Sequence, residues 1–549
     1  MTDSHRWLLP LLAVVSGGFY LGAETYSLDG GLGFPLDDSW IHLQFARNLA
    51  AGDGLSLNPG EWVTGSTAPL WTALLAIFFL FPGSPLLWSK LLGWSFYGLS
   101  VLLTRRVALQ LGLGPGLALL AATLVALTDW MLWSAVSGLE IPLFVTLSLW
   151  GTSIHLRERS RGDGEVVSLA VLALACLARP EGQLLLLLAL LDRSVRFDRN
   201  DPSGSLGIGW REPRAALVGA GLALVVLGPM LLFNVLVSGS VAPTTFAAKV
   251  GSSQAAGAGS FLPGLRYLFQ APIAILFASQ PIMTLSAAAG GFALVRRLGT
   301  DRDRGLLPVA WCVALPLAYG SLSVLGGSTI AGNFGRYFFP LVPFVVILGC
   351  LGIEGAAKAL GRSLRVGAVR LPLRALLVLL ILWPTLAGGV RGVRRYTQSV
   401  GNVHDSDVRA AHWLRDRIPP DAVLAVNDIG ALSYLLPNRV LDLAGIAHPS
   451  SRRYRVEAVA AGRPAAEGTL RFLEENRPDY LVIFPEWFPS LVARAERDPA
   501  SRFRILERFP IPDNITMGGS EVVVLSTPWA RGAAQVETGP AAEGPDGGL

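Results

Sequence analysis

Two adjacent carboxylates, Asp37 and Asp38, follow the first long apolar stretch of this 549-residue chain. Residues 39–51 have the spacing of an amphipathic helix that could lie on a membrane surface. Charge beside a membrane segment is costly unless it is used, so the pair is a candidate functional site. A positioned carboxylate can deprotonate a hydroxyl, and its neighbour can raise its pKa, orient it or share a divalent cation with it.

Helix capping is the alternative explanation for these acids. An Asp just before a helix is a good N-cap, and the local sequence supports capping and catalysis equally. Capping accounts for one carboxylate and leaves the second unexplained. Glu140 begins another apolar segment, where the helix dipole favours an acid. Glu181 stands two residues after Arg179, and we expect those two to pair with each other for structural reasons.

The composition is that of an integral membrane protein, with 52% hydrophobic and 15% charged residues. The three cysteines lie in apolar segments, so they indicate neither a disulfide framework nor a metal site. The net charge of +5 comes from arginines in the loops, which argues for membrane orientation and against nucleic-acid binding. The sequence contains no phosphate-binding loop and no dinucleotide fingerprint, which disfavours a nucleotide-driven pump.

Eleven apolar segments are predicted to span the membrane. The segment 68–82 is excluded because a span needs about 20 apolar residues and this one is bounded by Pro69 and Pro82. We expect an interfacial or re-entrant helix there. The predicted spans are 7–23, 85–104, 115–129, 140–156, 165–178, 182–192, 215–233, 271–295, 305–324, 337–353 and 371–390.

The distribution of basic residues sets the orientation. With 68–82 outside, the predicted cytoplasmic loops hold 19 Lys and Arg, against five in the outer loops before residue 391. Merging 165–178 with 182–192 would invert everything downstream, so we expect a hairpin there. Residues 1–390 are thus predicted to form a helical membrane domain, with its first outer loop at 24–84 and the following domain outside.

Residues 391–529 carry charges throughout and are predicted to form a soluble α/β domain. Residues 530–549 are rich in Gly, Ala, Pro and Glu and are predicted to be disordered. The domain is expected to contain helices at 407–417 and 468–476, and strands at 422–426, 439–443, 480–484 and 521–525.

Seven further motifs accompany the acidic pair in order along the chain. Together they resemble the GT-C superfamily of membrane glycosyltransferases, and within it the bacterial terminal arabinofuranosyltransferase-like branch. The resemblance implies the GT-C fold and an inverting sugar transfer from a polyprenyl phosphate to an acceptor outside the cell. Ser66 and the surroundings of Thr244 depart from the family pattern, so donor or acceptor preference can differ. The motifs are 58–71, 137–144, 179–182, 242–249, 335–340, 427–434 and 441–445.

The resemblance also implies cations that stabilise the phosphate leaving group at the outer interface. Arg336 and Lys249 rank above Lys90, which can simply extend its ammonium to lipid headgroups. Arg336 starts an outer helix, where a cation opposes the helix dipole, and this placement argues for an anionic partner. His42, Arg47, Asn58 and Tyr337 are expected to support the site.

A third carboxylate, Glu140, is expected to face Asp37 and Asp38. The three are candidate ligands for Mg²⁺, Mn²⁺ or Ca²⁺, although no cofactor is required by the sequence. The predicted function is a GT-C glycosyltransferase acting on a glycan, lipid or protein of the cell envelope, with a pentose or hexose donor. A flippase of a lipid-linked sugar is the alternative, disfavoured because the acids cluster at one face and no internal repeat is visible. An anchored binding or sensor protein would not need the three carboxylates together.

Overall fold

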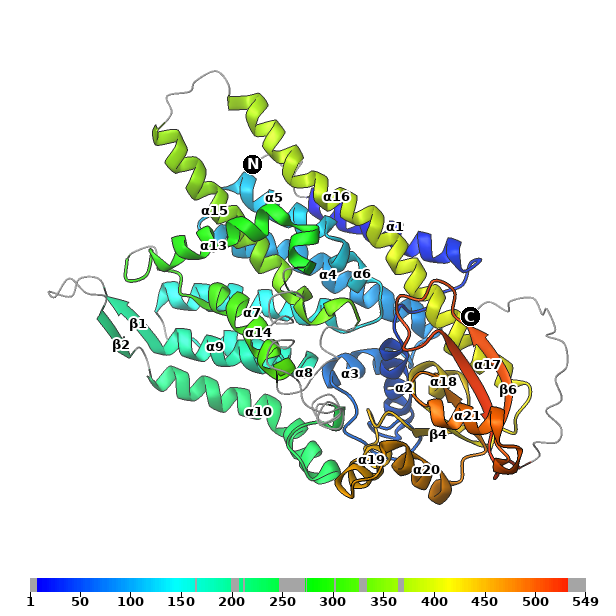
Figure 1. The fold of residues 1–549 in the computed structure, drawn as a ribbon. Helices are drawn as coiled ribbons and strands as arrows, with labels where there is room; N and C mark the ends of the chain where they lie inside the picture. Colours follow the sequence, from blue (N-terminus) through cyan, green and yellow to red (C-terminus); the bar gives the residue numbers. More distant parts are fainter. Residues whose placement is uncertain are drawn as a thin grey trace.

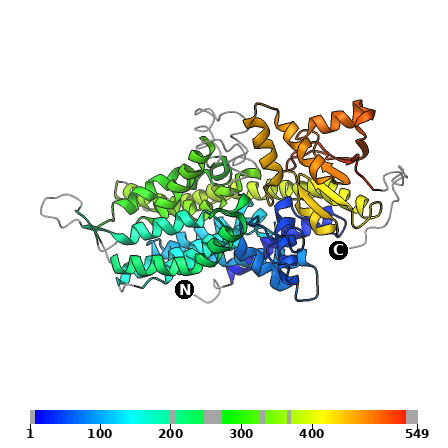
Figure 2. The same ribbon diagram turned by 90° about the horizontal axis from the view of Figure 1, so that it is seen from below.

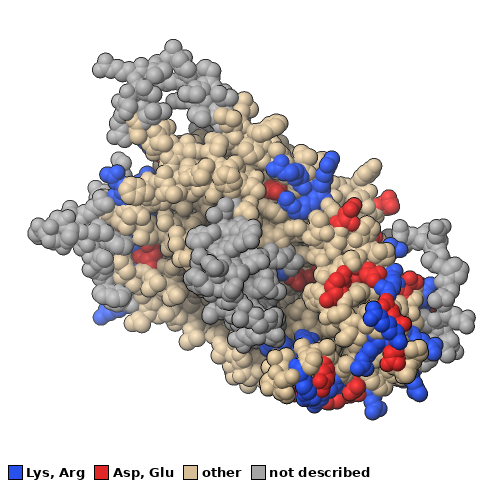
Figure 3. All heavy atoms as spheres, viewed as in Figure 1, with Lys and Arg blue, Asp and Glu red and all other residues tan. Residues whose placement is uncertain are grey.

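The computed structural model describes residues 7–162, 165–198, 207–210, 213–245, 272, 274–300, 303–324, 333–363 and 370–531. A bundle of helices makes up most of the molecule, and an α/β domain covers one end of it (Figures 1 and 2). Acidic and basic side chains gather over the α/β domain, whereas the visible face of the bundle is mostly uncharged (Figure 3). This contrast matches a membrane-embedded bundle that carries a water-exposed domain.

Four helices among the described residues are long and apolar enough to span a membrane, and one bent pair makes a fifth candidate. The predicted number of eleven is therefore not confirmed. The four are α1 (Leu8–Ser27), α4 (Pro85–Gln110), the Ala216–Ser238 part of α10 (Pro213–Ser238), and Phe334–Ala359, which joins η3 (Asn333–Leu341) to α15 (Val342–Ser363). The bent pair is α5 (Pro115–Leu127) with α6 (Asp129–Ala135), at 59°.

Shorter apolar helices fill the space between these. Helix α3 (Pro69–Phe78) has 10 residues, a length of about 15 Å, which is half the bilayer core. Helices α8 (Val167–Ala178) and α9 (Gly182–Ser194) are separate and pack against each other, as the expected hairpin requires. Helices α13 (Pro281–Val295) and α14 (Leu307–Val324) are two further apolar helices. Helix α7 (Ile141–Arg161) is longer, with 21 residues.

Three features of the bundle differ from the prediction. The segment 271–295 is not one helix, because Gln280 is non-helical and Pro281 starts α13 anew. Strands β1 (Val195–Asp198) and β2 (Gly207–Trp210) form an antiparallel hairpin within a predicted loop. Helix α16 (Arg370–Val403) has 34 residues and runs past the expected boundary at residue 390 into the α/β domain.

The α/β domain contains a five-stranded sheet of order β4-β3-β5-β7-β6. Strand β3 (Val423–Val426) runs parallel to β4 (Arg439–Asp442) and β5 (Tyr480–Ile483), while β7 (Glu521–Ser526) is antiparallel to β5 and β6. The four predicted strands are confirmed. Strand β6 (Arg504–Pro510) was not predicted, because it is a half-exposed edge strand with charged residues and a bulge.

Short helices cover both faces of this sheet. The two predicted helices are present, the first as a π-helical turn followed by α17. The elements are η4 (His404–Val408), α17 (Arg409–Arg415), α18 (Gly430–Leu435), α19 (Ser450–Ala460), α20 (Ala465–Asn476), α21 (Pro489–Arg497) and η5 (Pro499–Ser501). Most of the predicted tail, from residue 532 on, lies outside the described residues.

Helix α2 (Asp37–Ala51) lies between the bundle and the α/β domain. Trp40 and Leu43 belong to the core of the bundle. Ile41 and Phe45 instead pack into the core of the α/β domain, together with Leu432. The apolar face expected to contact the bilayer surface therefore contacts protein, and the acidic pair stands where the two parts of the molecule meet.

Candidate active site

Helix α2 holds both ends of α18. Asp37 accepts hydrogen bonds from the backbone N–H groups of Gly430 (2.6 Å) and Ala431 (2.7 Å). Arg47 donates to the carbonyls of Tyr434 (2.8 Å) and Ser433 (3.1 Å). Both contacts match the helix dipole, since an anion meets the N-terminus and a cation the C-terminus. The capping role considered for Asp37 is thus present, but the capped helix belongs to the α/β domain.

The close approach of α18 to α2 depends on a glycine. A Cβ atom at Gly430 would lie 2.3 Å from the Asp37 carbonyl oxygen and 2.6 Å from Oδ1 of its carboxylate. Any larger residue would push the two helices apart. The Asp37 carboxylate is therefore held in place by the α/β domain, although it belongs to the first outer loop.

Two further carboxyl groups of the α/β domain approach Asp37. Burial raises the pKa of Asp37 to about 6. The two N–H hydrogen bonds to its carboxylate oppose this shift, and the charge of Asp38 adds to it. Burial and the charge of Asp37 raise the pKa of Asp428 well above its usual value. Burial and the charge of Asp428 do the same for the pKa of Asp407. The site thus contains three acids whose pKa values are raised by burial, and the pKa of Asp37 is raised to about 6.

The sequence interpretation missed Asp407 and Asp428. Asp428 stands inside one of the matched motifs, just after the carboxyl end of parallel strand β3, which is where ligands approach sheets of this kind. That position could have identified it. Asp407 is only 2% exposed, and its Oδ2 has no hydrogen-bond partner among the described residues. No local pattern in the sequence distinguishes it from a surface acid of a helix.

Asp38 faces the bundle instead and forms an ion pair with Arg336. The Asp38 side chain is 37% exposed and that of Arg336 only 6%. Phe334 (φ 61°) and Gly335 (φ 63°) both adopt the left-handed conformation just before this arginine. For a phenylalanine that conformation is strained, and such strain is frequent at functional sites. The Nε of Arg336 is buried with no hydrogen-bond partner in the described part of the chain.

Glu140 belongs to a second ionic network beside Arg336. It accepts hydrogen bonds from Arg179 (2.5 Å), and its other oxygen lies 3.1 Å from Nε2 of His42. Arg179 also bonds Glu181 (2.6 Å), so the expected pair is confirmed, and Glu181 accepts from Tyr319.

Tyr337 connects this network to the Asp38–Arg336 pair. Its ring centroid lies 5.4 Å from the Arg179 guanidinium and 5.6 Å from that of Arg336. Both guanidinium groups thus share one aromatic ring, at cation–π distance. The sequence-predicted residues Asp38, His42, Glu140, Arg336 and Tyr337 are therefore brought together by the fold.

The three carboxylates proposed as metal ligands do not converge. Asp37 is bonded to α18, Asp38 to Arg336, and Glu140 to Arg179 and His42. Over the described ranges, no group of three His, Cys, Asp or Glu side chains is placed to hold a metal ion. The residues present do not fit a divalent cation at this position.

The remaining candidates have other surroundings. Lys90 is fully buried, where it donates to Glu24 (2.9 Å), the Val136 carbonyl (2.9 Å) and Tyr396 (3.0 Å). All three N–H groups of its ammonium are used inside the bundle. Lys90 therefore neither binds the donor phosphate nor extends to the lipid headgroups, which are the two roles that the sequence suggests. Asn58 bonds the edge of strand β4 and so supports the loop, as expected. Lys249 lies outside the described residues.

Comparison with known proteins places this geometry in context. Residues 394–525 match the model of a domain of unknown function, DUF8728. No curated protein matches the chain. Among solved structures, ArnT from Cupriavidus metallidurans bound to undecaprenyl phosphate aligns with a TM-score of 0.53 and 15% identity, over 93% of this chain and 97% of that one.

The oligosaccharyltransferase of Archaeoglobus fulgidus is also similar. Its structure tethered to an acceptor peptide containing the NVT sequon has a TM-score of 0.55 at 10% identity, over 87% of this chain and 69% of that one. Its complex with Zn and sulfate has a TM-score of 0.51 at 12% identity, over 89% and 69%. The chain therefore shares the fold of these two proteins, and four of its described helices are long and apolar enough to cross a membrane. Neither protein is described as an arabinofuranosyltransferase.

Proposed function

We propose that this protein is a glycosyltransferase that moves a sugar from a polyprenyl phosphate to an acceptor outside the cell. The observation that carries the proposal is the meeting of Asp37, Asp38 and Arg336 at the junction of bundle and α/β domain. The GT-C fold and the described ligands of its neighbours, undecaprenyl phosphate and an acceptor peptide, support the reaction class.

Asp37 is assigned as the general base. A base works best when its pKa lies near the working pH, and Asp37, at about 6, meets this condition. It takes the proton of the acceptor hydroxyl as the oxygen attacks the anomeric carbon. The bond from that carbon to the phosphate oxygen breaks, and the polyprenyl phosphate leaves with the electron pair. Attack opposite the leaving group inverts the configuration of the sugar.

Arg336 is assigned to the leaving phosphate. It already holds one anion, Asp38, and its buried Nε is available for another. A planar guanidinium can bind a phosphate through two parallel hydrogen bonds, and it stabilises charge most where water is excluded. Asp38 then orients Arg336, and the Arg179–Glu140 pair holds Tyr337 beneath it. Lys249 remains a second phosphate-binding candidate from the sequence.

The location and specificity belong to the same proposal. The proposed location of the site and the α/β domain is the outer face of the bacterial inner membrane, and the excess of arginine in the predicted inner loops supports this orientation. The motif resemblance favours arabinofuranose as the sugar, with mannose or another hexose as the alternative. The acceptor is a glycan, lipid or protein of the cell envelope.

The test is release of polyprenyl phosphate from labelled polyprenyl-phosphate sugars by the purified full chain. Asp37→Asn should lower turnover by about 10²–10⁴-fold, the usual scale for a general base, at normal donor affinity. Arg336→Gln and Asp38→Asn should instead raise the KM for the donor. The matched control is Asp53→Asn, two residues beyond α2. Normal turnover of Asp37→Asn would refute its assignment, and a labelled sugar that crosses membranes without being released would indicate a flippase.

A further inference from the structure

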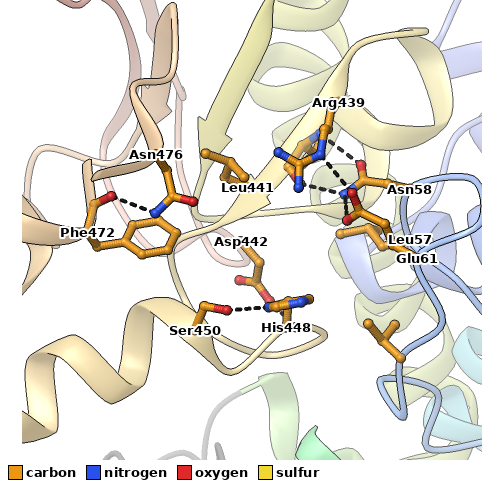
Figure 4. Close-up of a pocket in the computed structure, with 12 residues that line it drawn as sticks. Leu57, Asn58, Glu61, Arg439, Leu441, Asp442, His448, Ser450, Phe472 and Asn476 are labelled. Atoms are coloured by element: carbon orange, nitrogen blue, oxygen red, sulfur yellow. Dashed lines mark hydrogen bonds and ion pairs between the residues drawn. The ribbon is translucent and has the colours of Figure 1, made fainter. Parts of the chain in front are cut away.

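A shallow, partly open pocket lies between the first outer loop and the α/β domain (Figure 4). The loop contributes Asn58 and Glu61 to one side, next to Arg439 of strand β4. Helix α20 contributes Phe472 and Asn476 to the other side. The pocket is thus built from both parts of the molecule and is separate from the Asp38–Arg336 pair.

The loop side of the pocket is fixed by hydrogen bonds. The Asn58 side chain donates to the Val440 carbonyl (3.0 Å) and accepts from the Val440 N–H (2.9 Å). It thereby occupies the free edge of strand β4, as a neighbouring strand would. Asn58 also donates to Glu61 (3.0 Å), which pairs with Arg439 at 2.8 Å. A pocket whose wall is held in this way is preformed, and preformed sites lose less entropy on binding.

The charges that line the pocket are already compensated. Glu61 and Arg439 neutralise each other, which leaves little attraction for an anion. The Asp442 carboxylate accepts three backbone N–H groups, from Gly445 (2.7 Å), Ala447 (2.7 Å) and His448 (3.1 Å). An acid bonded in this way offers little to a cation. The pocket therefore suits a neutral ligand.

The polar groups that remain suit a ligand rich in hydroxyls. His448 bonds Ser450 through Nδ1 (2.6 Å), and no hydrogen bond of its Nε2 is found among the described residues. Asn476 donates to the Phe472 carbonyl (2.8 Å), and its side-chain oxygen is available. Phe472 and Leu441 supply apolar surface between these groups. A sugar ring combines hydroxyl groups at its rim with apolar C–H faces, and small-molecule sites have this same mixture of apolar lining and few placed polar groups.

We propose that this pocket binds a saccharide unit of the acceptor, at a distance from the reacting hydroxyl; this rests on the proposed function. The Leu57 carbonyl in its wall accepts from Gln44 (2.7 Å). Gln44 lies seven residues beyond Asp37 on α2, which is about 10 Å along the helix axis. An acceptor of a few linked sugars can place one unit in the pocket while its terminal hydroxyl reaches Asp37. The acceptor is accordingly a glycan or a glycosylated molecule.

Saturation-transfer NMR on the full chain, in a detergent without a sugar headgroup, tests the pocket directly. The probes are the methyl glycosides of arabinofuranose, mannopyranose, galactopyranose and glucopyranose at millimolar concentration. At least one should give a saturable signal. Asn476→Trp fills the pocket from an exposed position and should reduce that signal at least 5-fold, whereas Glu474→Trp, on the same exposed turn, should leave it unchanged. His448→Ala should weaken the Kd by about 2- to 10-fold, as loss of one neutral hydrogen bond does.

Two results would refute the proposal that the pocket binds a saccharide. One is the absence of a signal from all four glycosides, and the other is a signal from the Asn476→Trp variant equal to that of the unmodified chain. The assay contains no donor, so it is independent of turnover. If polyprenyl phosphate is released but no glycoside binds, the pocket proposal fails and the proposed function stands. If glycosides bind in the pocket and none of the donors is consumed, the proposed function fails instead.

Discussion

Gly430→Ala should separate α18 from α2 and reduce turnover although no reacting group is replaced. The added Cβ would lie 2.3 Å from the Asp37 carbonyl oxygen, which is backbone and cannot rotate away. Overpacking of this kind costs about 1–3 kcal/mol, and better helix propensity of Ala returns at most about 1 kcal/mol. At about 2–4 °C per kcal/mol for a domain of 150–250 residues, the melting temperature should fall by several degrees.

The effect on turnover should be larger than the effect on stability. The hydrogen bonds of 2.6 and 2.7 Å that orient the Asp37 carboxylate must lengthen or break. A displacement of about 1 Å at a reacting group costs on the order of 10²-fold in rate. Both quantities can be measured on one preparation, by release of labelled polyprenyl phosphate and by thermal unfolding.

A matched control is available in the same part of the molecule. Gly401 is also helical, on α16, and its Cβ would meet nothing within 4 Å. Gly401→Ala should keep wild-type turnover and gain about 0.5–1 kcal/mol of stability. Wild-type turnover and melting temperature in Gly430→Ala would refute the idea that the α/β domain positions Asp37.

Three further outcomes are expected. The base must be deprotonated to act, and the pKa of Asp37 is raised to about 6, so kcat/KM should rise as the pH increases through that value and then become constant. Asp37→Asn should remove this rise. An unchanged pH profile in the variant would exclude Asp37 as the titrating group. Lys90→Met leaves the buried Glu24 carboxylate without its cation, although Tyr396 and the Gly33 N–H still donate to it, so the variant should destabilise the protein by about 3–5 kcal/mol and lower its yield. Adding Glu24→Gln should restore much of the yield, and wild-type stability of the single variant would contradict a structural role. In intact cells, a cysteine at exposed Ala51 should react with an impermeant thiol reagent, whereas one at exposed Ser160 should react only after permeabilisation; the reverse pattern would invert the proposed orientation.

Local sequence patterns predicted where the helices and strands lie better than they predicted which parts of the molecule these elements contact. Apolar periodicity located α2 and the four buried or half-buried strands, because burial on one face leaves a repeat in the sequence. It did not reveal that Ile41 and Phe45 meet the α/β domain, since lipid and protein cores select the same residue types. Strand β6 was not predicted, because an edge strand need not be apolar and so leaves no apolar pattern in the sequence.

The acidic pair, Glu140 and Arg336 were identified as a set from their types, their positions at segment ends and the motif order. Which groups they contact depends on residues far away in the chain. Asp37 and Asp38 are neighbours in sequence, yet they point to different parts of the molecule. Lys90 shows the same limit, because burial against Glu24 on α1 leaves no local trace that distinguishes it from a lysine near lipid headgroups.

The contact between Asp37 and Gly430 also sets the order of events during synthesis. The two residues are 393 positions apart, so at about 5–20 residues per second the first is made about 20–80 s before the second. For that period Ile41 and Phe45 have no partner domain to pack against, and the Asp37 carboxylate has no helix to hold it. A chain interrupted before residue 430 would contain the first outer loop but leave Asp37 unpositioned. Under the proposed assignment of Asp37 as the base, catalytic competence is therefore acquired late, when the α/β domain docks on one of the first-made helices, and interrupted copies stay inactive.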